Sequence, residues 1–299
     1  MNIVPLKVFI YNCSVKLFLD CRNKFLMRYN PRKIIDKYWR KDFDYPIDWN
    51  SPRDINEKIQ WLQVNTDTSA WSLLADKVKV RDYVANRGLA NILVPLYGVY
   101  KRIKDIQFDS LPDRFVLKCN HDSGSVQVVY KLSDNYAPEE IRNKLSNCLK
   151  RDVLGIKGEI HYHKIRPRLI IAEQYLGAVT DYKVWCFGGE PYCILACADR
   201  TSSSVALMVY DLDWKARPDV MAEDGIHKVG STDLPKPVSF GKMLEAASIL
   251  AEGFPQVRVD FYDVNGTLYF GEMTFTSMCG RMRYFTPEFL KELGNKTRI

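Results

Sequence analysis

Residues 258–274 read RVDFYDVNGTLYFGEMT, and their alternation with a period of two predicts two strands joined by a tight turn. The side chains of this hairpin divide between two faces. The expected apolar face carries Val257, Val259, Phe261, Tyr269, Met273 and Phe275, and the polar face carries Arg258, Asp260, Glu272 and Thr274. Two carboxylates on one face supply the hard oxygen ligands that Mg²⁺ prefers. The alternative is a surface hairpin with two solvated acids.

The register of this hairpin depends on the length of its loop. A two-residue loop at Asn265-Gly266 would place acidic and apolar side chains on one face. We therefore expect a three-residue loop with Gly266 as the bulge residue. In that register Asp260 pairs with Phe270, and Glu272 is its diagonal neighbour at about 7–8 Å.

The composition limits which classes of protein the chain can belong to. The 299 residues are 46% hydrophobic and 12% aromatic, which supports a packed core and excludes global disorder. The net charge of +7 favours anionic ligands such as nucleotides, acidic sugars or phospholipid headgroups. No nucleic-acid-binding motif accompanies this charge, so no nucleic-acid partner is expected. The eight cysteines lack CxxC spacing, and a reducing cytoplasm is the expected location.

The N-terminal segment 3–26 is apolar but interrupted by charged residues, so it predicts neither a membrane-spanning helix nor a signal peptide. Two interpretations remain. The segment forms either a basic interfacial helix at the inner face of the membrane, or a helix packed on its own domain.

Hydrophobic periodicity predicts a mixture of helices and antiparallel strands. Helices are expected to begin at Ser51 and near Asp76 (the latter ending at Gly88) and to span 138–150 and 240–252. Strands are expected at 92–99, 114–120, 126–131, 168–172, 181–187, 192–197 and 205–212. This mixture favours an α+β fold over a doubly wound parallel sheet.

A basic residue followed by a small polar loop lies between two of these strands. Lys118 is followed by Ser123, Gly124 and Ser125, whose backbone N–H groups can close over phosphate oxygens. A plain hairpin remains the alternative, because the spacing of a Walker A loop is absent.

A second candidate site lies where the apolar strand 168–172 ends. Glu173 and the loop after it can bind an adenine edge, or the strand simply ends in solvent. Asp181 and Lys183 open the next strand. His161 and His163 form a two-histidine pair that either binds a metal or lies on an exposed loop.

In this order the motifs resemble the ATP-grasp superfamily, and more closely its TupA-like family from bacterial polysaccharide gene clusters. The resemblance covers roughly residues 50–290. Its matching strings are Asn56-Glu-Lys-Ile-Gln-Trp61, Leu74-Ala-Asp-Lys77, Arg81-Asp-Tyr83, the run from Phe115 to Gly124, Asp181-Tyr-Lys183, the run from Phe254 to Tyr262, and Tyr269-Phe-Gly-Glu272.

The resemblance implies two α+β lobes that clasp ATP. It implies a mainly helical extension over 1–75, a first lobe with the phosphate loop over 76–172, and a second lobe with the magnesium-binding hairpin over 173–299. The implied ATP ligands are Lys77, Lys118, Ser123, Gly124, Ser125, Glu173, Tyr175, Leu176, Asp181 and Lys183. The implied metal ligands are Asp260, Glu272 and Thr274, and Arg258 and Lys118 are implied to be catalytic.

Two departures from the family pattern matter. Thr274 stands where many ATP-grasp ligases have Asn, which puts a second metal site in doubt. The turn that follows contains Arg281 and Arg283, which either bind an anionic acceptor or are solvated.

The resemblance implies a carboxylate–amine ligase that works through an acyl phosphate, with ATP and Mg²⁺ as cofactors. The expected substrate is a uronic-acid-containing surface polysaccharide, such as a capsule, or its precursor. The alternatives are a sugar kinase, a glycosyltransferase, and a scaffold with a vestigial ATP site.

Overall fold

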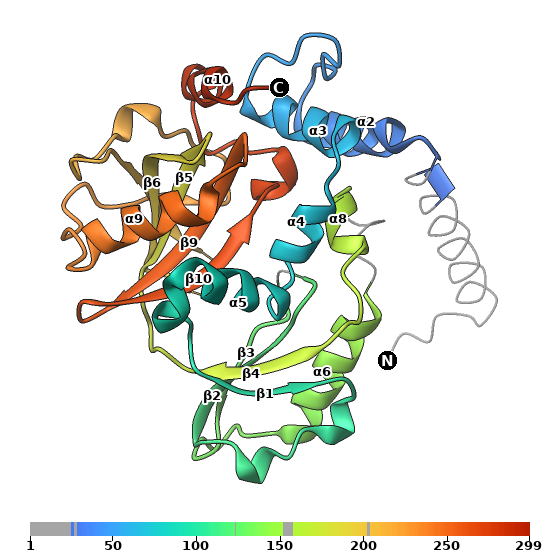
Figure 1. The fold of residues 1–299 in the computed structure, drawn as a ribbon, viewed down its shortest axis with the longest axis vertical. Helices are drawn as coiled ribbons and strands as arrows, with labels where there is room; N and C mark the ends of the chain where they lie inside the picture. The colour runs from blue at the N-terminus through green and yellow to red at the C-terminus, as the bar shows by residue number, and fades with distance from the viewer. Residues whose placement is uncertain (1–24, 27–28, 123, 152–157, 202–203) are drawn as a thin grey trace, which may run out of the picture.

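The computed structural model describes residues 25–26, 29–122, 124–151, 158–201 and 204–299. Within this part of the chain helices pack against two β-sheets, and α5 lies between the sheets (Figure 1). The helices are α2 (Pro31–Asp42), α3 (Ile55–Asn65), α4 (Ser69–Leu74), α5 (Lys79–Val84), α6 (Pro138–Lys150), α8 (Ile160–His163), α9 (Phe240–Ala251) and α10 (Pro287–Lys296). The short helical turns are η1 (Ala85–Leu89), η2 (Ala90–Ile92), η3 (Ile103–Asp105), η4 (Phe108–Ser110), η5 (Pro218–Val220) and η6 (Ser277–Gly280).

The strands confirm the predicted mixture of helices and antiparallel pairs. They are β1 (Leu96–Tyr100), β2 (Arg114–Cys119), β3 (Gln127–Tyr130), β4 (Ile170–Gln174), β5 (Asp181–Phe187), β6 (Glu190–Ala198), β7 (Ala206–Tyr210), β8 (Lys228–Val229), β9 (Gln256–Val264) and β10 (Thr267–Thr274). The first sheet has the order β1-β4-β2-β3 and the second has the order β10-β9-β5-β6-β7-β8.

The first sheet is covered by a helix on one face only. Alternate residues of β2 are buried against α6, in a cluster that includes Phe115, Leu117, Cys119, Leu145 and Cys148. Because side chains alternate across a strand, Val116 and Lys118 point to the opposite face. That face lines the cavity described below.

The second sheet is buried on both faces, which explains its nearly continuous apolar strands. One face packs against α5 and α9, in a cluster that includes Val80, Val84, Val184, Met243 and Leu250. The other face packs against α3 and α10, in a cluster that includes Ile55, Ile59, Trp185, Phe289 and Leu293. Helix α3 is therefore part of the core of the second sheet, although it lies far from those strands in sequence.

The predicted register of the β9–β10 hairpin is wrong. The turn has two residues, Asn265 and Gly266, and the extra residue lies in a bulge at Gly271. Phe270 pairs with Phe261 instead of Asp260, and Glu272 pairs directly with Asp260. The bulge restores the separation of apolar and polar faces, so the tight turn does not mix them.

The change of register also changes the apolar face of the hairpin. The buried cluster contains Leu268 and Phe270, whereas Tyr269, which was expected there, is only partly buried. A Cβ at position 271 would lie 3.0 Å from the Asp260 carbonyl oxygen, which accounts for glycine at this position.

Several predicted boundaries shift. The helix expected from near Asp76 to Gly88 is α5 over Lys79–Val84 followed by η1, and the strand expected over 168–172 is β4 over Ile170–Gln174. The helix expected from Ser51 begins at Ile55, because Asp54 is its N-cap and accepts a hydrogen bond from the Glu57 N–H at 2.9 Å. The strand expected over 92–99 begins at Leu96, after the η2 turn. Nothing in the described part of the chain is a helix both long enough and apolar enough to span a membrane.

Candidate functional site

A cavity of about 880 Å³ lies between the two sheets. The first sheet contributes Lys118 and Val128 to its lining, and the second contributes Ala196, Met208 and Tyr262. The segment 173–181, which joins the sheets, forms the wall between them. The structure thus brings the predicted phosphate lysine and the predicted adenine-binding segment to one cavity.

Glu173 is held by two cations at the end of β4. Its carboxylate lies 2.6 Å from Lys118 Nζ and 3.3 Å from Arg81 Nη1. Arg81 Nη2 also donates to the Val94 carbonyl at 2.9 Å, so this guanidinium is fixed from two sides. The Lys118–Glu173 pair lines the cavity, and a phosphate entering it competes with Glu173 for the lysine.

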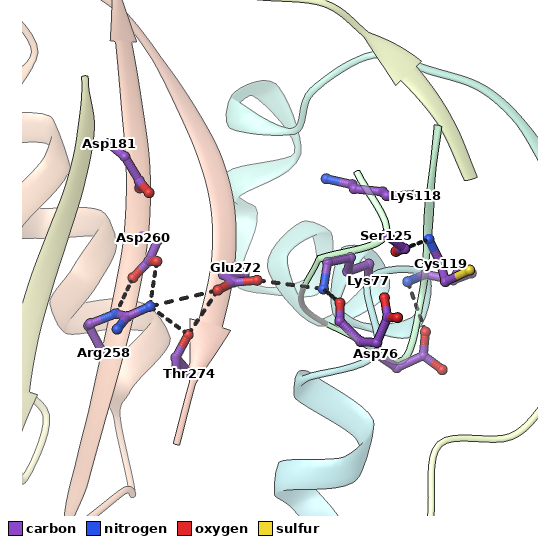
Figure 2. Close-up of polar contacts among 12 residues, drawn as sticks. Asp76, Lys77, Lys118, Cys119, Ser125, Asp181, Arg258, Asp260, Glu272 and Thr274 are labelled. Carbon is purple, nitrogen blue, oxygen red and sulfur yellow. Dashed lines mark hydrogen bonds and ion pairs between the residues drawn. The ribbon is translucent and has the colours of Figure 1, made fainter. Parts of the chain in front are cut away.

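The predicted phosphate loop is described only in part, because Ser123 lies outside the described residues. Gly124 is exposed, has a φ of 115°, and lines the cavity. Ser125 is buried and accepts a hydrogen bond from the Cys119 N–H at 2.8 Å, which closes the base of the loop (Figure 2). The Asp122 carbonyl accepts a hydrogen bond from Lys77 Nζ at 2.9 Å.

Asp260 lies at the centre of a buried charge cluster on the second sheet (Figure 2). Arg258 donates to both of its oxygens, at 2.7 and 2.8 Å. Lys183, which pairs with Asp260 across β5 and β9, donates to the carboxylates of both Asp260 and Asp181. Burial lowers the pKa of Lys183, but the two carboxylates outweigh it and raise the pKa, so the ammonium stays charged.

Glu272 differs from Asp260 in its exposure. The side chain of Glu272 is 32% exposed, against 2% for Asp260. Lys77 Nζ lies 3.6 Å from its carboxylate, and the Thr274 hydroxyl donates to it at 3.2 Å. Burial raises the pKa of Glu272, but the positive charges of Lys77, Lys183, Arg258 and Lys118 outweigh that effect and lower the pKa to about 2. Glu272 is therefore ionised and accessible.

The donor atoms of this cluster fit a magnesium ion. A carboxylate can accept about four bonds. Asp260 accepts three, from Arg258 and Lys183, and so has one position left, whereas Glu272 accepts one, from Thr274. No group of three or more His, Cys, Asp or Glu side chains suited to a metal occurs among the described residues. Phosphate oxygens and water would complete the shell, which is the usual environment of Mg²⁺ in proteins.

The remaining predicted residues are less closely grouped. Tyr175 and Leu176 line the cavity, and the Tyr175 ring lies 5.4 Å from that of Tyr130. Arg281 is bound by Asp42 at 2.6 Å, so a residue outside the resemblance provides its partner. Arg283 is exposed.

Three residues of the site were missed from the sequence. Arg81 belongs to a matching string but received no role, and it holds Glu173. Arg200 lies 3.6 Å from Asp181 and lines the cavity. Ser277 accepts a hydrogen bond from Arg258 Nη1 at 3.0 Å. Of these, only Arg81 had a signal in the sequence, because it stands within a recognised string.

His161 is not on an exposed loop. It is fully buried on α8, with its ring 5.7 Å from that of Trp71 and 6.4 Å from that of Phe275. Among the described residues, neither ring nitrogen has a hydrogen-bond partner. Burial, together with the charge of Lys164, lowers the pKa of His161 from 6.5 to about 3.

Because the pKa of His161 is low in the folded chain, we expect a loss of stability in mild acid. The unfolded chain takes up a proton near pH 6.5 and the folded chain does so only near pH 3, so acid favours unfolding throughout that interval. The loss is about 1.4 kcal/mol per pH unit. His161→Phe should decrease the slope of unfolding free energy against pH by about one proton in urea titrations between pH 7 and 5. The control is His163→Phe on the same helix. Equal slopes in the two variants would contradict the prediction.

Comparison with known proteins identifies a family for this chain. The family described as TupA-like ATPgrasp matches residues 57–298. No curated protein matches the sequence. The D-alanine–D-alanine ligase from Bacillus anthracis complexed with ATP is 13% identical, with 89% of this chain and 78% of that chain covered and a TM-score of 0.47. The L-amino acid ligase from Bacillus licheniformis is 15% identical, with 83% and 55% covered and a TM-score of 0.48. The family match confirms the predicted α+β ATP-grasp fold.

Proposed function

Because this chain belongs to the TupA-like ATP-grasp family, we propose that it is an ATP-dependent carboxylate–amine ligase acting through an acyl phosphate. The observation that supports this most is the convergence of two groups of charged side chains from opposite sides, next to the cavity that Lys118 and Asp181 line. Lys77 and Lys118 come from the first side, and Arg258, Asp260 and Glu272 come from the second.

In the proposed reaction a carboxylate oxygen of the donor attacks the γ-phosphorus of ATP. The bond to the β–γ bridging oxygen breaks, and ADP leaves. The amine nitrogen of the acceptor then attacks the acyl carbon, a C–N bond forms, the amine loses a proton, and inorganic phosphate leaves. Neither step requires a nucleophilic side chain, since positioning and charge neutralisation carry phosphoryl transfer.

The residues of this chain have separate tasks in that scheme. Lys118 releases Glu173 and binds the α- and β-phosphates of ATP. Arg81 then remains as the positively charged partner of Glu173. The guanidinium of Arg258 faces the acyl phosphate and stabilises its charge. Glu272 and the remaining position on Asp260 would hold a magnesium ion, which would supply positive charge to balance the phosphates.

The proposed substrates are a uronic acid, or a polysaccharide containing one, and an amino acid or other amine. The family's occurrence in polysaccharide gene clusters supports this class of substrate. The net charge of +7 agrees with an acidic substrate.

The test is phosphate release by the purified protein with ATP, Mg²⁺, glucuronate or galacturonate, and pooled amino acids. Release should depend on the acceptor, and mass spectrometry should detect an amide product. A phosphorylated sugar would identify a kinase instead. Absence of both ATP binding and phosphate release would refute the proposal.

Lys118→Met should weaken ATP binding by roughly 10- to 100-fold, because a charged hydrogen bond contributes about 1.5–3 kcal/mol. The matched control is Lys131→Met. Lys131 donates a hydrogen bond to the Leu111 carbonyl, and neither Lys131 nor Leu111 lines the cavity. Isothermal titration calorimetry measures the ATP affinity of both variants. Equal affinities in the two variants would exclude Lys118 from the nucleotide site.

A further inference from the structure

Helix α3 presents three amide side chains to the protein interior. Asn56, Gln60 and Gln63 lie four and three residues apart, so they share one helix face, and each is at most 3% exposed. Buried amides are stable only when their donors and acceptors are satisfied. Their hydrogen-bond partners therefore show which part of the chain packs against this helix face.

Two of these amides, Asn56 and Gln60, bond to the segment that follows β10. Asn56 donates to the Met282 carbonyl at 2.9 Å and accepts from the Met282 N–H at 3.0 Å. Gln60 Nε2 donates to the carbonyls of Cys279 and Gly280 at 2.8 and 3.0 Å. Gln63 holds Gln60 in place by donating to its Oε1 at 2.9 Å. We refer to residues 277–282 as the clamped turn.

The clamped turn has an unfavourable backbone conformation. Met278 and Cys279 have φ values of 47° and 59°, in the left-handed region that residues other than glycine seldom adopt. A Cβ on Gly280 would lie 2.5 Å from Gln60 Nε2, so the helix side chain directly contacts the turn backbone. Such a conformation persists when surrounding contacts hold it, and the α3 amides are those contacts.

The clamped turn begins at a residue that touches the proposed reaction centre. Ser277 is buried, and its hydroxyl accepts from Arg258 Nη1 at 3.0 Å. The other described polar contacts of this guanidinium are to Asp260, Thr274 and Glu272, all on the hairpin. Ser277 is therefore the contact that anchors this planar guanidinium from outside the hairpin, among the described residues.

We propose that Asn56 and Gln60 are positioning residues for Arg258. They hold the clamped turn so that Ser277 orients the guanidinium toward the acyl phosphate. This inference rests on the proposed function. It explains why a polar helix face far from the metal hairpin in sequence is buried against that particular turn.

The test compares two substitutions on the same helix. Gln60→Met removes two hydrogen bonds to the clamped turn. Lys58→Met also removes two hydrogen bonds to backbone carbonyls, but those belong to Gly294 and Thr297 at the other end of the chain. We expect Gln60→Met to lower acceptor-dependent turnover by roughly 10- to 100-fold with unchanged ATP affinity. Lys58→Met should keep turnover within about twofold. Equal turnover in the two variants would overturn the inference.

A double-mutant cycle separates positioning from general stability. Ser277→Ala should lower turnover to a similar extent, and adding Gln60→Met to it should have little further effect, because both act through one contact. Independent, multiplicative losses would contradict the proposal.

Amide hydrogen exchange gives a readout that does not need the reaction. Exchange in the peptide covering 277–282 should be faster in Gln60→Met than in Lys58→Met. If the unsubstituted protein releases no phosphate with any acceptor, the proposed function fails, and exchange alone decides the inference. Unchanged exchange in Gln60→Met would then overturn it.

Discussion

Asp260→Ala is expected to lower the free energy of unfolding by about 3–5 kcal/mol and to abolish turnover. Removing one partner of a buried ion pair leaves the other charge without compensation. Here the substitution removes both bonds that Arg258 Nε and Nη2 make to the carboxylate, and it leaves Lys183 with Asp181 alone. Urea unfolding measures the change.

The control for this substitution is an acid on the surface. Asp213 is exposed, so Asp213→Ala should change stability by no more than about 0.5 kcal/mol. A loss below 1 kcal/mol in Asp260→Ala would show that the charge cluster is not a structural unit.

Glu272→Gln is expected to lower turnover strongly, with a smaller loss of stability than Asp260→Ala. The side chain of Glu272 is 32% exposed and its contact with Lys77 is 3.6 Å, so solvent screens the pair in part, and the free energy of unfolding should fall by less than in Asp260→Ala. Turnover should fall by about 100-fold or more, because Glu272 has most of the free oxygen positions for the metal. The Mg²⁺ concentration for half-maximal rate should rise.

Phosphate release measured across a series of Mg²⁺ concentrations tests this prediction. Glu245→Gln, an exposed substitution on α9, serves as the control. If Glu272→Gln kept normal turnover and magnesium dependence, the metal would have to be held elsewhere. Together the two substitutions assign charge balance to Asp260 and cation binding to Glu272.

Local patterns in the sequence predict the elements well. The helix expected at 138–150 is α6 with the same limits, because Pro138 and the run of charged residues mark it clearly. The strands before and after the predicted phosphate loop likewise agree with β2 and β3 to within one residue at each end. The limits of these elements depend on residues close together in the sequence, so the pattern of hydrophobic and polar residues predicts them.

The register error has a local cause that was visible in the sequence. A glycine inside a strand often marks a bulge, and Gly271 stands directly before Glu272. The prediction placed the extra residue at the loop because Gly266 offered an equally suitable position. Only the packing of Phe270 against Phe261 decides between the two.

Contacts across the fold had no comparable signal. Lys183 reaches Asp260 because β5 lies beside β9, and strand order is not encoded in either segment alone. Asn56 bonds to Met282 across 226 positions of sequence. Amides at 56, 60 and 63 mark a polar face on helix α3, but they do not show which segment packs against it.

The bulge at Gly271 gives a criterion for sorting related sequences. Because the side chains of a strand alternate, one residue added to or lost from the hairpin between Asp260 and Glu272 would turn one acid away from the other. A homologue that keeps both acids but changes the spacing by one should therefore have lost cation-dependent chemistry. The length of this hairpin should then distinguish active homologues from inactive ones, even where every charged residue is retained.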